Sequence, residues 1–261
     1  MGARTLAFYS VKGGVGKTAA SVNVAYEATR DGFKTVLCDL DPQGAASFYF
    51  RIRPPKKHGP KALIKGAGRL NRAIRGTDFE SLDVLPSSLS LRKLDIQLDR
   101  VKRSKKRLRE TLDPLTREYD LVLLDCPPSM TLVSENVFRA ADYVVVPCIP
   151  TTLSMLTFEK LQDFFKKQRL KRSKILAFFS MVEARKKLQR DVMDNMNQNE
   201  RYFMNTRIPY LAEIERMGLE RKPVACYSPN SLAATRYNEL WREIKQRALK
   251  SRHGRSRRRQ S

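Results

Sequence analysis

The chain lacks the long hydrophobic run that a membrane-spanning helix requires. None of its apolar stretches approaches the roughly 20 residues needed to cross a bilayer. The start of the chain also lacks the pattern of a signal peptide, because the short apolar segment Leu6–Tyr9 is followed directly by a glycine-rich loop. We therefore predict a cytoplasmic protein without stable membrane insertion.

Cysteine and histidine are scarce, which leaves few ligands for a metal cluster. The four cysteines show no C-x-x-C spacing, and Cys38 and Cys148 lie in or beside apolar strand patterns. We interpret the cysteines as buried thiols in a reducing compartment. The two histidines, His58 and His253, lie in basic, turn-rich segments without a metal or catalytic partner nearby in the sequence.

Acidic residues are outnumbered, because 51 Lys and Arg residues oppose 27 Asp and Glu residues and give a net charge of +24. Such an excess argues for a polyanionic partner, either nucleic acid or anionic lipid. The last twelve residues, 250–261, contain no hydrophobic residue, so we predict a basic, disordered tail. The remaining residues 1–249 are enough for one large domain.

Apolar runs alternate with helical patterns along the chain. The predicted strands are Leu6–Tyr9, Thr35–Leu40, Leu82–Leu85, Leu121–Asp125, Tyr143–Val146 and Ile175–Val182. The predicted helices are Thr18–Arg30, Met155–Gln168, Leu188–Asn197 and Leu232–Leu249, and the very basic segment Leu89–Arg117 is predicted to be mostly helical. The strands are continuous apolar runs, which is typical of strands covered on both faces. This order predicts an α/β fold with a doubly wound, mostly parallel sheet and helices on both faces.

The most informative segment is K-G-G-V-G-K-T, Lys12–Thr18, which lies between a predicted strand and a predicted helix. Glycines let backbone N–H groups approach phosphate oxygens, and the helix N-terminus adds unpaired donors and a positive dipole. Lys17 can reach the β- and γ-phosphates, and Thr18 can ligate Mg²⁺. The general P-loop pattern has a glycine where this chain has Val11. We expect ATP to be bound by Gly13, Gly14, Val15, Gly16, Lys17, Thr18 and Ala19.

Carboxylates follow two other predicted strands. Asp125 ends an apolar run and precedes Pro127–Pro128, so the strand must stop there, at the sheet edge where ligands bind. Asp39 and Asp41 end the second strand and, as alternate residues, can point the same way. In-line phosphoryl transfer needs a held Mg²⁺ and a positioned water. We expect Asp125 and Thr18 to hold the metal, while one of the two other aspartates supports it and the other orients water. The alternative for each aspartate is an ordinary turn.

Several motifs together carry a family resemblance. Because a second lysine, Lys12, opens the loop, Lys12–Thr18 resembles the deviant Walker A motif of the ParA/MinD group of P-loop ATPases. Asp39–Gly44 resembles the ParA switch, and Leu121–Ser129 resembles the Walker B segment of the group. Weaker similarities are Val144–Pro147, Ser180–Arg185 and Ile208–Pro209. The resemblance extends from about Arg4 to about Ala248.

This resemblance implies an ATPase that uses ATP and Mg²⁺ and dimerises in the ATP state. It assigns Asp41 to the attacking water and Asp39 to support of the metal, and it places Pro209 among the nucleotide-binding residues. It also implies that Lys12 reaches the phosphates bound by a second subunit, as an arginine finger does, which can be worth about 10³ to 10⁵ in rate. The alternative for Lys12 is a solvated loop lysine. The catalytic set is then Lys12, Lys17, Asp39 and Asp41, and the metal ligands are Thr18, Asp125 and Asp39.

The resemblance to the ParA type further implies ATP-dependent binding of non-specific DNA. Such a protein positions a plasmid, a chromosome origin or a protein assembly over the nucleoid, and a ParB-like partner stimulates hydrolysis. Basic runs that could contact DNA occur at 102–109, 166–174, 216–222 and in the tail. We favour Arg216, Arg221, Lys222, Arg252, Arg255, Arg257, Arg258 and Arg259, with phosphate contacts and no reading of bases. Any single run could instead be a solvated helix face.

Three other functions stay open. A MinD-like membrane-surface ATPase requires an amphipathic C-terminal helix, and the tail supplies cations without an apolar face. An electron-transfer ATPase resembling the nitrogenase iron protein would need cluster ligands, for which only Cys126 and Cys148 lie near suitable strand ends. A nucleic-acid-binding factor with a vestigial nucleotide site is opposed by the intact loop and aspartates.

Overall fold

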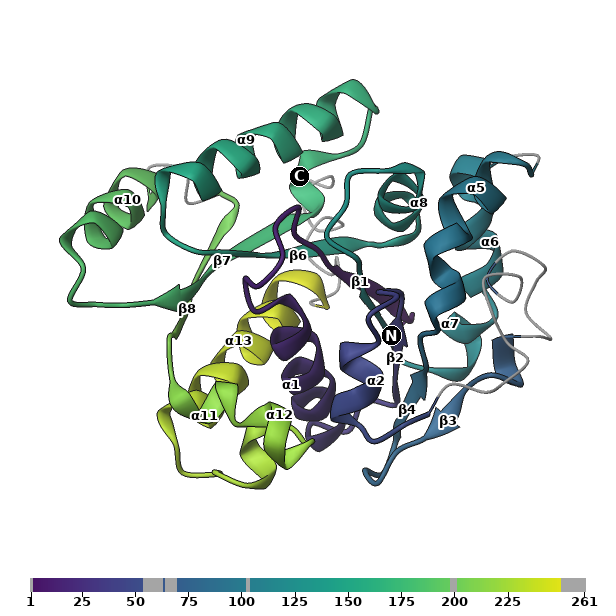
Figure 1. Ribbon diagram of the computed structural model, residues 1–261, viewed down its shortest axis with the longest axis horizontal. Coiled ribbons are helices and arrows are strands. Elements are labelled where there is room, and N and C mark those ends of the chain that lie inside the picture. Colours follow the sequence, from purple (N-terminus) through teal and green to yellow (C-terminus); the bar gives the residue numbers. More distant parts are fainter. Residues whose placement is uncertain (1, 54–62, 64–69, 102–103, 198–200, 250–261) are drawn as a thin grey trace, which may run out of the picture.

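The computed structural model describes residues 2–53, 63, 70–101, 104–197 and 201–249. These residues form an eight-stranded sheet in the order β3-β4-β2-β5-β1-β6-β7-β8, in which every neighbouring pair is parallel except β3 and β4 (Figure 1). The strands are β1 (Arg4–Phe8), β2 (Thr35–Asp39), β3 (Arg75–Gly76), β4 (Leu82–Leu85), β5 (Leu121–Asp125), β6 (Tyr143–Cys148), β7 (Ile175–Val182) and β8 (Phe203–Pro209). The predicted doubly wound, mostly parallel α/β fold is confirmed.

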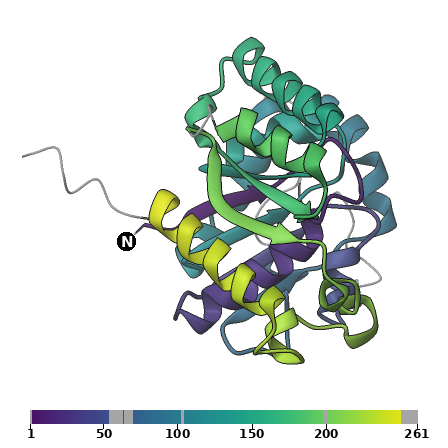
Figure 2. The same ribbon diagram turned by 90° about the vertical axis from the view of Figure 1, so that its left-hand side faces the viewer.

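Helices cover both faces of this sheet, as the two views show (Figures 1 and 2). One face carries α5 (Leu94–Asp99), α6 (Arg107–Leu112), α7 (Leu115–Glu118), α8 (Leu132–Ala140), α9 (Thr152–Lys167) and α10 (Lys187–Asn197). The other face carries α1 (Lys17–Arg30), α2 (Ala45–Tyr49), α11 (Ala212–Glu215), α12 (Met217–Glu220) and α13 (Leu232–Ala248). Short 3₁₀ turns are η1 (Leu89–Lys93), η2 (Ser104–Lys106), η3 (Arg172–Lys174) and η4 (Val224–Cys226).

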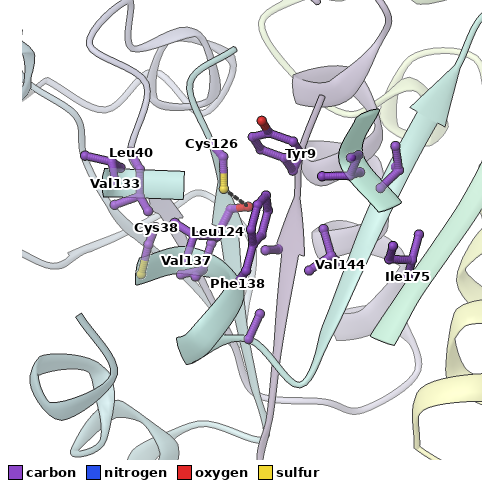
Figure 3. Close-up of a cluster of buried hydrophobic side chains, with 14 of the residues drawn as sticks. Tyr9, Cys38, Leu40, Leu124, Cys126, Val133, Val137, Phe138, Val144 and Ile175 are labelled. Carbon is purple, nitrogen blue, oxygen red and sulfur yellow. Dashed lines mark hydrogen bonds between the residues drawn. The ribbon is translucent and has the colours of Figure 1, made fainter. Parts of the chain in front are cut away.

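The core is split by the sheet into two layers, because successive strand residues point to opposite faces. In β1, Ala7 packs on the α8 side, whereas Leu6 and Phe8 pack on the side of α1 and α13. On the α8 side, the rings of Tyr9 and Phe138 meet edge to face at 4.7 Å (Figure 3). Both faces of the central strands are therefore buried, which is why these strands appear in the sequence as continuous apolar runs.

Some elements differ from the sequence-based expectation. The segment Leu89–Arg117 is mostly helical, as predicted, and its helical residues are divided among η1, α5, η2, α6 and α7. Pro114, which has no N–H to donate, separates the last two of these helices. The edge strand β8 was not predicted, since Asn205 and Arg207 are exposed and interrupt its apolar pattern. The helices α2 and α8 were also not predicted.

Some expectations concern residues outside the described ones, namely the tail 250–261, His58 and His253. Within the described ranges, no helix is long and apolar enough to cross a membrane.

Candidate nucleotide-binding site

Three neighbouring strands bring the candidate site together. In the order β2-β5-β1, the carboxyl ends of all three strands lie at one edge of the sheet. The glycine loop follows β1, Asp125 ends β5 and Asp39 ends β2, where Asp39 and Asp125 are direct neighbours in the strand register. Residues separated by more than eighty positions in the sequence thus meet at a single edge.

The loop needs glycine for its conformation and for space. Gly14 and Gly16 have φ angles of +70° and +84°, which side chains rarely allow. A Cβ at Gly16 would also lie only 2.8 Å from Ser180 Oγ of β7. Gly16 caps α1 without any side-chain hydrogen bond, and the first turn of α1 contains no acidic residue. The free N–H groups of that turn are therefore available to an anion.

Lys17, Thr18 and Asp125 form a tight polar cluster at the start of α1. Thr18 Oγ1 donates a hydrogen bond to Asp125 Oδ2 at 2.8 Å, and Lys17 Nζ lies 3.3 Å from Asp125 Oδ1. Lys17 Nζ is also 3.8 Å from Asp41 Oδ2. Burial opposes the charge of Lys17, but the nearby Asp125 and Asp41 carboxylates outweigh it and raise the pKa of Lys17. The lysine therefore stays cationic inside a nearly closed site.

The aspartates of β2 and its loop have different surroundings. Asp39 Oδ2 accepts hydrogen bonds from the backbone N–H of Ser47 at 2.8 Å and from Ser47 Oγ at 2.7 Å. Burial, reinforced by the charge of Asp125, raises the pKa of Asp39 to about 7. Asp41 faces Lys17, accepts the N–H of Gln43 at 3.0 Å, and its carbonyl accepts a hydrogen bond from Ser87 Oγ.

Ser47 and Ser87 are positioning residues that sequence reasoning missed. Ser47 Oγ, besides donating to Asp39, accepts the backbone N–H of Ser87 at 3.0 Å. The two serines therefore link α2 and the end of β4 to the loop that carries Asp41. No motif marks either serine, so only the fold shows their role.

The donor set fits a magnesium ion bound together with phosphates. Asp39 Oδ1 is buried and has no hydrogen-bond partner, so a carboxylate oxygen is left for a cation or a proton. Asp125 and Thr18 offer two further oxygens beside it. Within the described ranges, no group of three or more His, Cys, Asp or Glu residues could hold a metal ion alone. Mg²⁺ is usually held by one or two carboxylates together with phosphates and waters.

Lys12 and Pro209 lie farther from this cluster. Lys12 is half-buried beside Val146 and Cys148 at the wall of a small cavity, and its backbone N–H donates to Ser10 Oγ at 3.3 Å. Among the described residues, no carboxylate is within ion-pair distance of the Lys12 ammonium. Pro209 ends β8 at the same sheet edge, but β6 and β7 separate it from the strand before the loop.

The described DNA-binding candidates differ in how many contacts they make within the chain. Arg221 donates from Nε to the Phe48 carbonyl at 3.1 Å and lies over the Phe48 ring at 4.4 Å. Arg216 pairs with Glu220 at 2.9 Å and remains largely exposed. Lys222 has no hydrogen bond or ion pair with another described residue. The five tail arginines lie outside the described residues.

Cys126 and Cys148 are buried thiols. Cys126 Sγ lies 3.5 Å from the Leu124 carbonyl oxygen, as drawn in Figure 3, and Cys148 Sγ lies 3.8 Å from that of Val146. Burial raises the pKa of Cys148 to about 12. These surroundings favour protonated, inert thiols rather than cluster ligands.

The sheet order, the glycine loop before α1 and the lysine–threonine–aspartate cluster define a P-loop nucleotide-binding protein. A family model described as "AAA domain" matches residues 3–178. The chain is 30% identical over 246 residues to the virulence plasmid ParA family protein pGP5-D of Chlamydia psittaci, covering 92% of this chain and 94% of that protein. It is also 30% identical over 251 residues to the chromosome-partitioning ATPase Soj of Treponema pallidum, covering 92% and 96%.

A solved structure shares the fold along nearly the whole chain. Cobyrinic acid a,c-diamide synthase from Mycobacterium smegmatis, with bound ADP and magnesium, matches with a TM-score of 0.77 at 25% identity, over 95% of this chain and 96% of that chain. The chain belongs to the ParA/MinD family of P-loop ATPases.

Proposed function

We propose that the protein is a Mg²⁺-dependent ATPase whose ATP state dimerises, binds non-specific DNA and positions or partitions a cargo. The cluster of Lys17, Thr18 and Asp125 behind an uncapped helix N-terminus carries this proposal. The name of the chromosome-partitioning ATPase Soj, a relative along nearly the whole chain, supports the positioning role. We place the protein in the cytoplasm at the nucleoid, with a ParB-like activator.

We propose a part in ATP hydrolysis for each of these residues. Amides of the loop Gly13–Thr18 and the Lys17 ammonium would hold the β- and γ-phosphates. The ADP and magnesium bound by the synthase neighbour support nucleotide binding by this fold. Thr18 and Asp125 would hold Mg²⁺, with Asp39 supporting it. Bound Mg²⁺ supplies charge neutralisation at the phosphoryl oxygens. Asp41, on the loop anchored by Ser87, orients the attacking water.

Lys12 is proposed to act on the nucleotide of the second subunit. Its ammonium has no acidic partner among the described residues of its own chain, so it is available to a facing triphosphate. Two anionic nucleotides that face each other need cations between them, which makes the dimer depend on ATP.

The experiment measures the mass of the protein by light scattering after size exclusion, with Mg²⁺ and a non-hydrolysable ATP analogue. Wild type is expected to dimerise, whereas Lys12→Ala stays monomeric and still binds a fluorescent nucleotide. Lys160→Ala, which removes an exposed lysine of α9, is the charge-matched control and is expected to dimerise. A normal dimer from Lys12→Ala would refute the role in trans.

DNA binding is proposed for the ATP state, through Arg216, Arg221, Lys222 and the tail Arg252, Arg255, Arg257, Arg258 and Arg259. Pairing two chains doubles the basic surface and strengthens binding by avidity. Gel shift with duplex DNA, compared with co-sedimentation on anionic liposomes, tests this partner against a membrane surface. A wild-type protein that stays monomeric with saturating ATP and Mg²⁺ and ignores duplex at modest salt would overturn the proposed function.

A further inference from the structure

A large open groove lies at the edge of the sheet opposite to the phosphate loop. Its volume is about 810 Å³, and its walls come from α6, the end of α8 and the turn between α9 and η3. Asp142 and Lys174 in these walls directly precede β6 and β7, which places the groove at the amino ends of these strands. The helices α6 and α8 pack side by side beside it (Figure 1).

The acidic residues of the groove are already occupied. Asp142 Oδ2 accepts the backbone N–H of Thr5 at 2.9 Å. Asp113 pairs with Arg117 at 3.3 Å, and Glu110 pairs with an arginine of its own helix at 3.4 Å. Asp113 and Glu110 are therefore paired with arginines outside the groove lining, whereas Asp142 keeps its negative charge near Lys174.

The groove is lined by more cationic side chains than nearby carboxylates can pair with. They are Lys106, Arg109, Arg139, Arg169, Lys171 and Lys174. Two of them are engaged, because Arg139 pairs with Glu135 at 2.7 Å and Lys174 Nζ donates to the Ala141 carbonyl at 2.6 Å. For the other four, no carboxylate of the described ranges lies within ion-pair distance.

The positive charges of the groove contribute to the lowered pKa of Lys174, which lies among them. Burial lowers the pKa of Lys174, and the charges of Arg109, Lys171 and Arg139 lower it further, against the opposing effect of Asp142. An anion in the groove would relieve this repulsion among cations.

The composition of the lining indicates which anion fits. Among the described residues that line the groove, Leu170 is the single apolar one and none is aromatic. Small-molecule sites are mostly apolar, and a membrane surface site needs an apolar face to insert, so neither suits this groove. Exposed cations continue beyond its rim at Lys166, Lys167 and Arg172. A ligand that is charged along its length fits this arrangement.

We propose that this groove binds the phosphodiester backbone of nucleic acid, as a second contact surface apart from Arg216–Lys222. The inference rests on the proposed DNA binding and adds a site to it. Because the groove offers charges without base-reading or stacking groups, its contacts are independent of sequence and depend strongly on salt.

The test measures binding of the full chain, with ATP and Mg²⁺, to a fluorescent duplex of mixed sequence over a series of salt concentrations. In the variant Arg109→Glu/Lys171→Glu, we expect weaker binding and a slope of log K against log salt that is reduced by about 1.8, or 0.9 for each phosphate that the variant no longer neutralises. The control Lys93→Glu/Lys160→Glu makes the same change of charge on exposed residues outside the groove and is expected to keep the wild-type slope.

The outcomes separate this inference from the proposed function. If wild type binds duplex and the groove variant keeps the wild-type slope, only the groove site is overturned. If the groove variant loses binding to vesicles of phosphatidylglycerol but keeps binding to duplex, the groove takes a lipid headgroup and the inference fails. If wild type does not bind duplex, the proposed function and the groove site both fall. Should the double variant unfold, as judged by its thermal midpoint, Lys171→Ala on the exposed turn replaces it with an expected slope change of about 0.9.

Discussion

At Gly16 two independent constraints act on one residue. The φ angle of +84° disfavours any side chain, and a Cβ there would meet Ser180 Oγ at 2.8 Å. The first constraint is local to the backbone, whereas the second exists only because β7 passes beside the loop. Both the loop conformation and the packing of the sheet edge therefore require a glycine before Lys17.

Gly16→Ala is expected to lower the free energy of unfolding by about 1–2 kcal/mol, since a left-handed conformation costs that much for a residue with a Cβ. Urea denaturation measures the loss, and Gly13→Ala is the control, because no atom lies within 4 Å of a Cβ built there. Adding Ser180→Ala to Gly16→Ala should restore the part that is due to the close contact. Unchanged stability of Gly16→Ala would show that the loop tolerates a side chain.

At the scale of elements, α2 is attached to α12. Arg221, in a left-handed conformation at the end of α12, binds the carbonyl and the ring of Phe48 in α2. In return, Arg51 donates to the Glu220 carbonyl at 3.1 Å. The helix that follows the Asp41 loop is therefore fastened to the segment that carries the basic residues 216–222.

Arg221→Ala is expected to lower the free energy of unfolding by about 1 kcal/mol, because it removes a hydrogen bond and a cation–π contact. Lys222→Ala removes the same charge without a hydrogen bond or ion pair to another described residue and should change stability by less than about 0.5 kcal/mol. Chemical denaturation of both variants makes the comparison. Equal stabilities would show that Arg221 contributes only charge.

Glu243 fastens α13 to the edge strand β8. Its carboxylate accepts the backbone N–H groups of Asn205 and Thr206, both at 2.9 Å, and pairs with Arg247 at 2.8 Å. Although burial opposes it, these donors and the Arg247 charge lower the pKa of Glu243 below its ordinary 4.5. The carboxylate therefore stabilises the fold above that ordinary value, and this stabilisation is lost as the pH falls through the lowered folded-state pKa.

Glu243→Gln is expected to cost about 1.5 kcal/mol at neutral pH, the scale of hydrogen bonds to a charged group. The difference from wild type should disappear in acid, below the folded-state pKa. Unfolding followed against pH measures both, with Glu239→Gln as control, because Glu239 makes an exposed ion pair with Arg236 on the same helix. A difference that persists in acid would contradict the linkage.

At the scale of the whole molecule, the candidate site exists only in the folded chain. Lys17 and Asp125 are 108 positions apart, and they meet because β5 lies beside β1 in the sheet. A ligand of this site therefore binds the native state and not the unfolded chain. Binding at 100 times Kd stabilises a native state by about 2.7 kcal/mol.

ATP with Mg²⁺ at that saturation should raise the free energy of unfolding by about 2.7 kcal/mol. EDTA should remove most of the gain, because we propose that the metal links the phosphates to Asp125 and Thr18. Thermal unfolding with and without ligand measures the shift. Lys17→Ala should show little response to ATP. A shift of equal size in that variant would place the nucleotide elsewhere.

How far the sequence predicts the molecule depends on how local the signal is. The strand Leu121–Asp125 and the loop Lys12–Thr18 are recognisable because each is a contiguous pattern with one structural meaning. The strand β8 and the helix α2 escaped prediction, because exposed residues on an edge strand and a helix of five residues leave weak patterns. Ser47 escaped for a different reason, since its partner Asp39 is set by the packing of α2 on the sheet.

The sequence by itself determined the fold class, the phosphate loop and the sign of the charge. Strands buried on both faces must be continuous apolar runs, and a phosphate cradle is built from adjacent residues of one turn. Only the tertiary structure decided that Arg221 lies on Phe48 and that Arg109 and Lys171 share a groove. Such pairings join segments far apart in the chain, and the order of the strands and the packing of the helices select which of the many basic residues become neighbours.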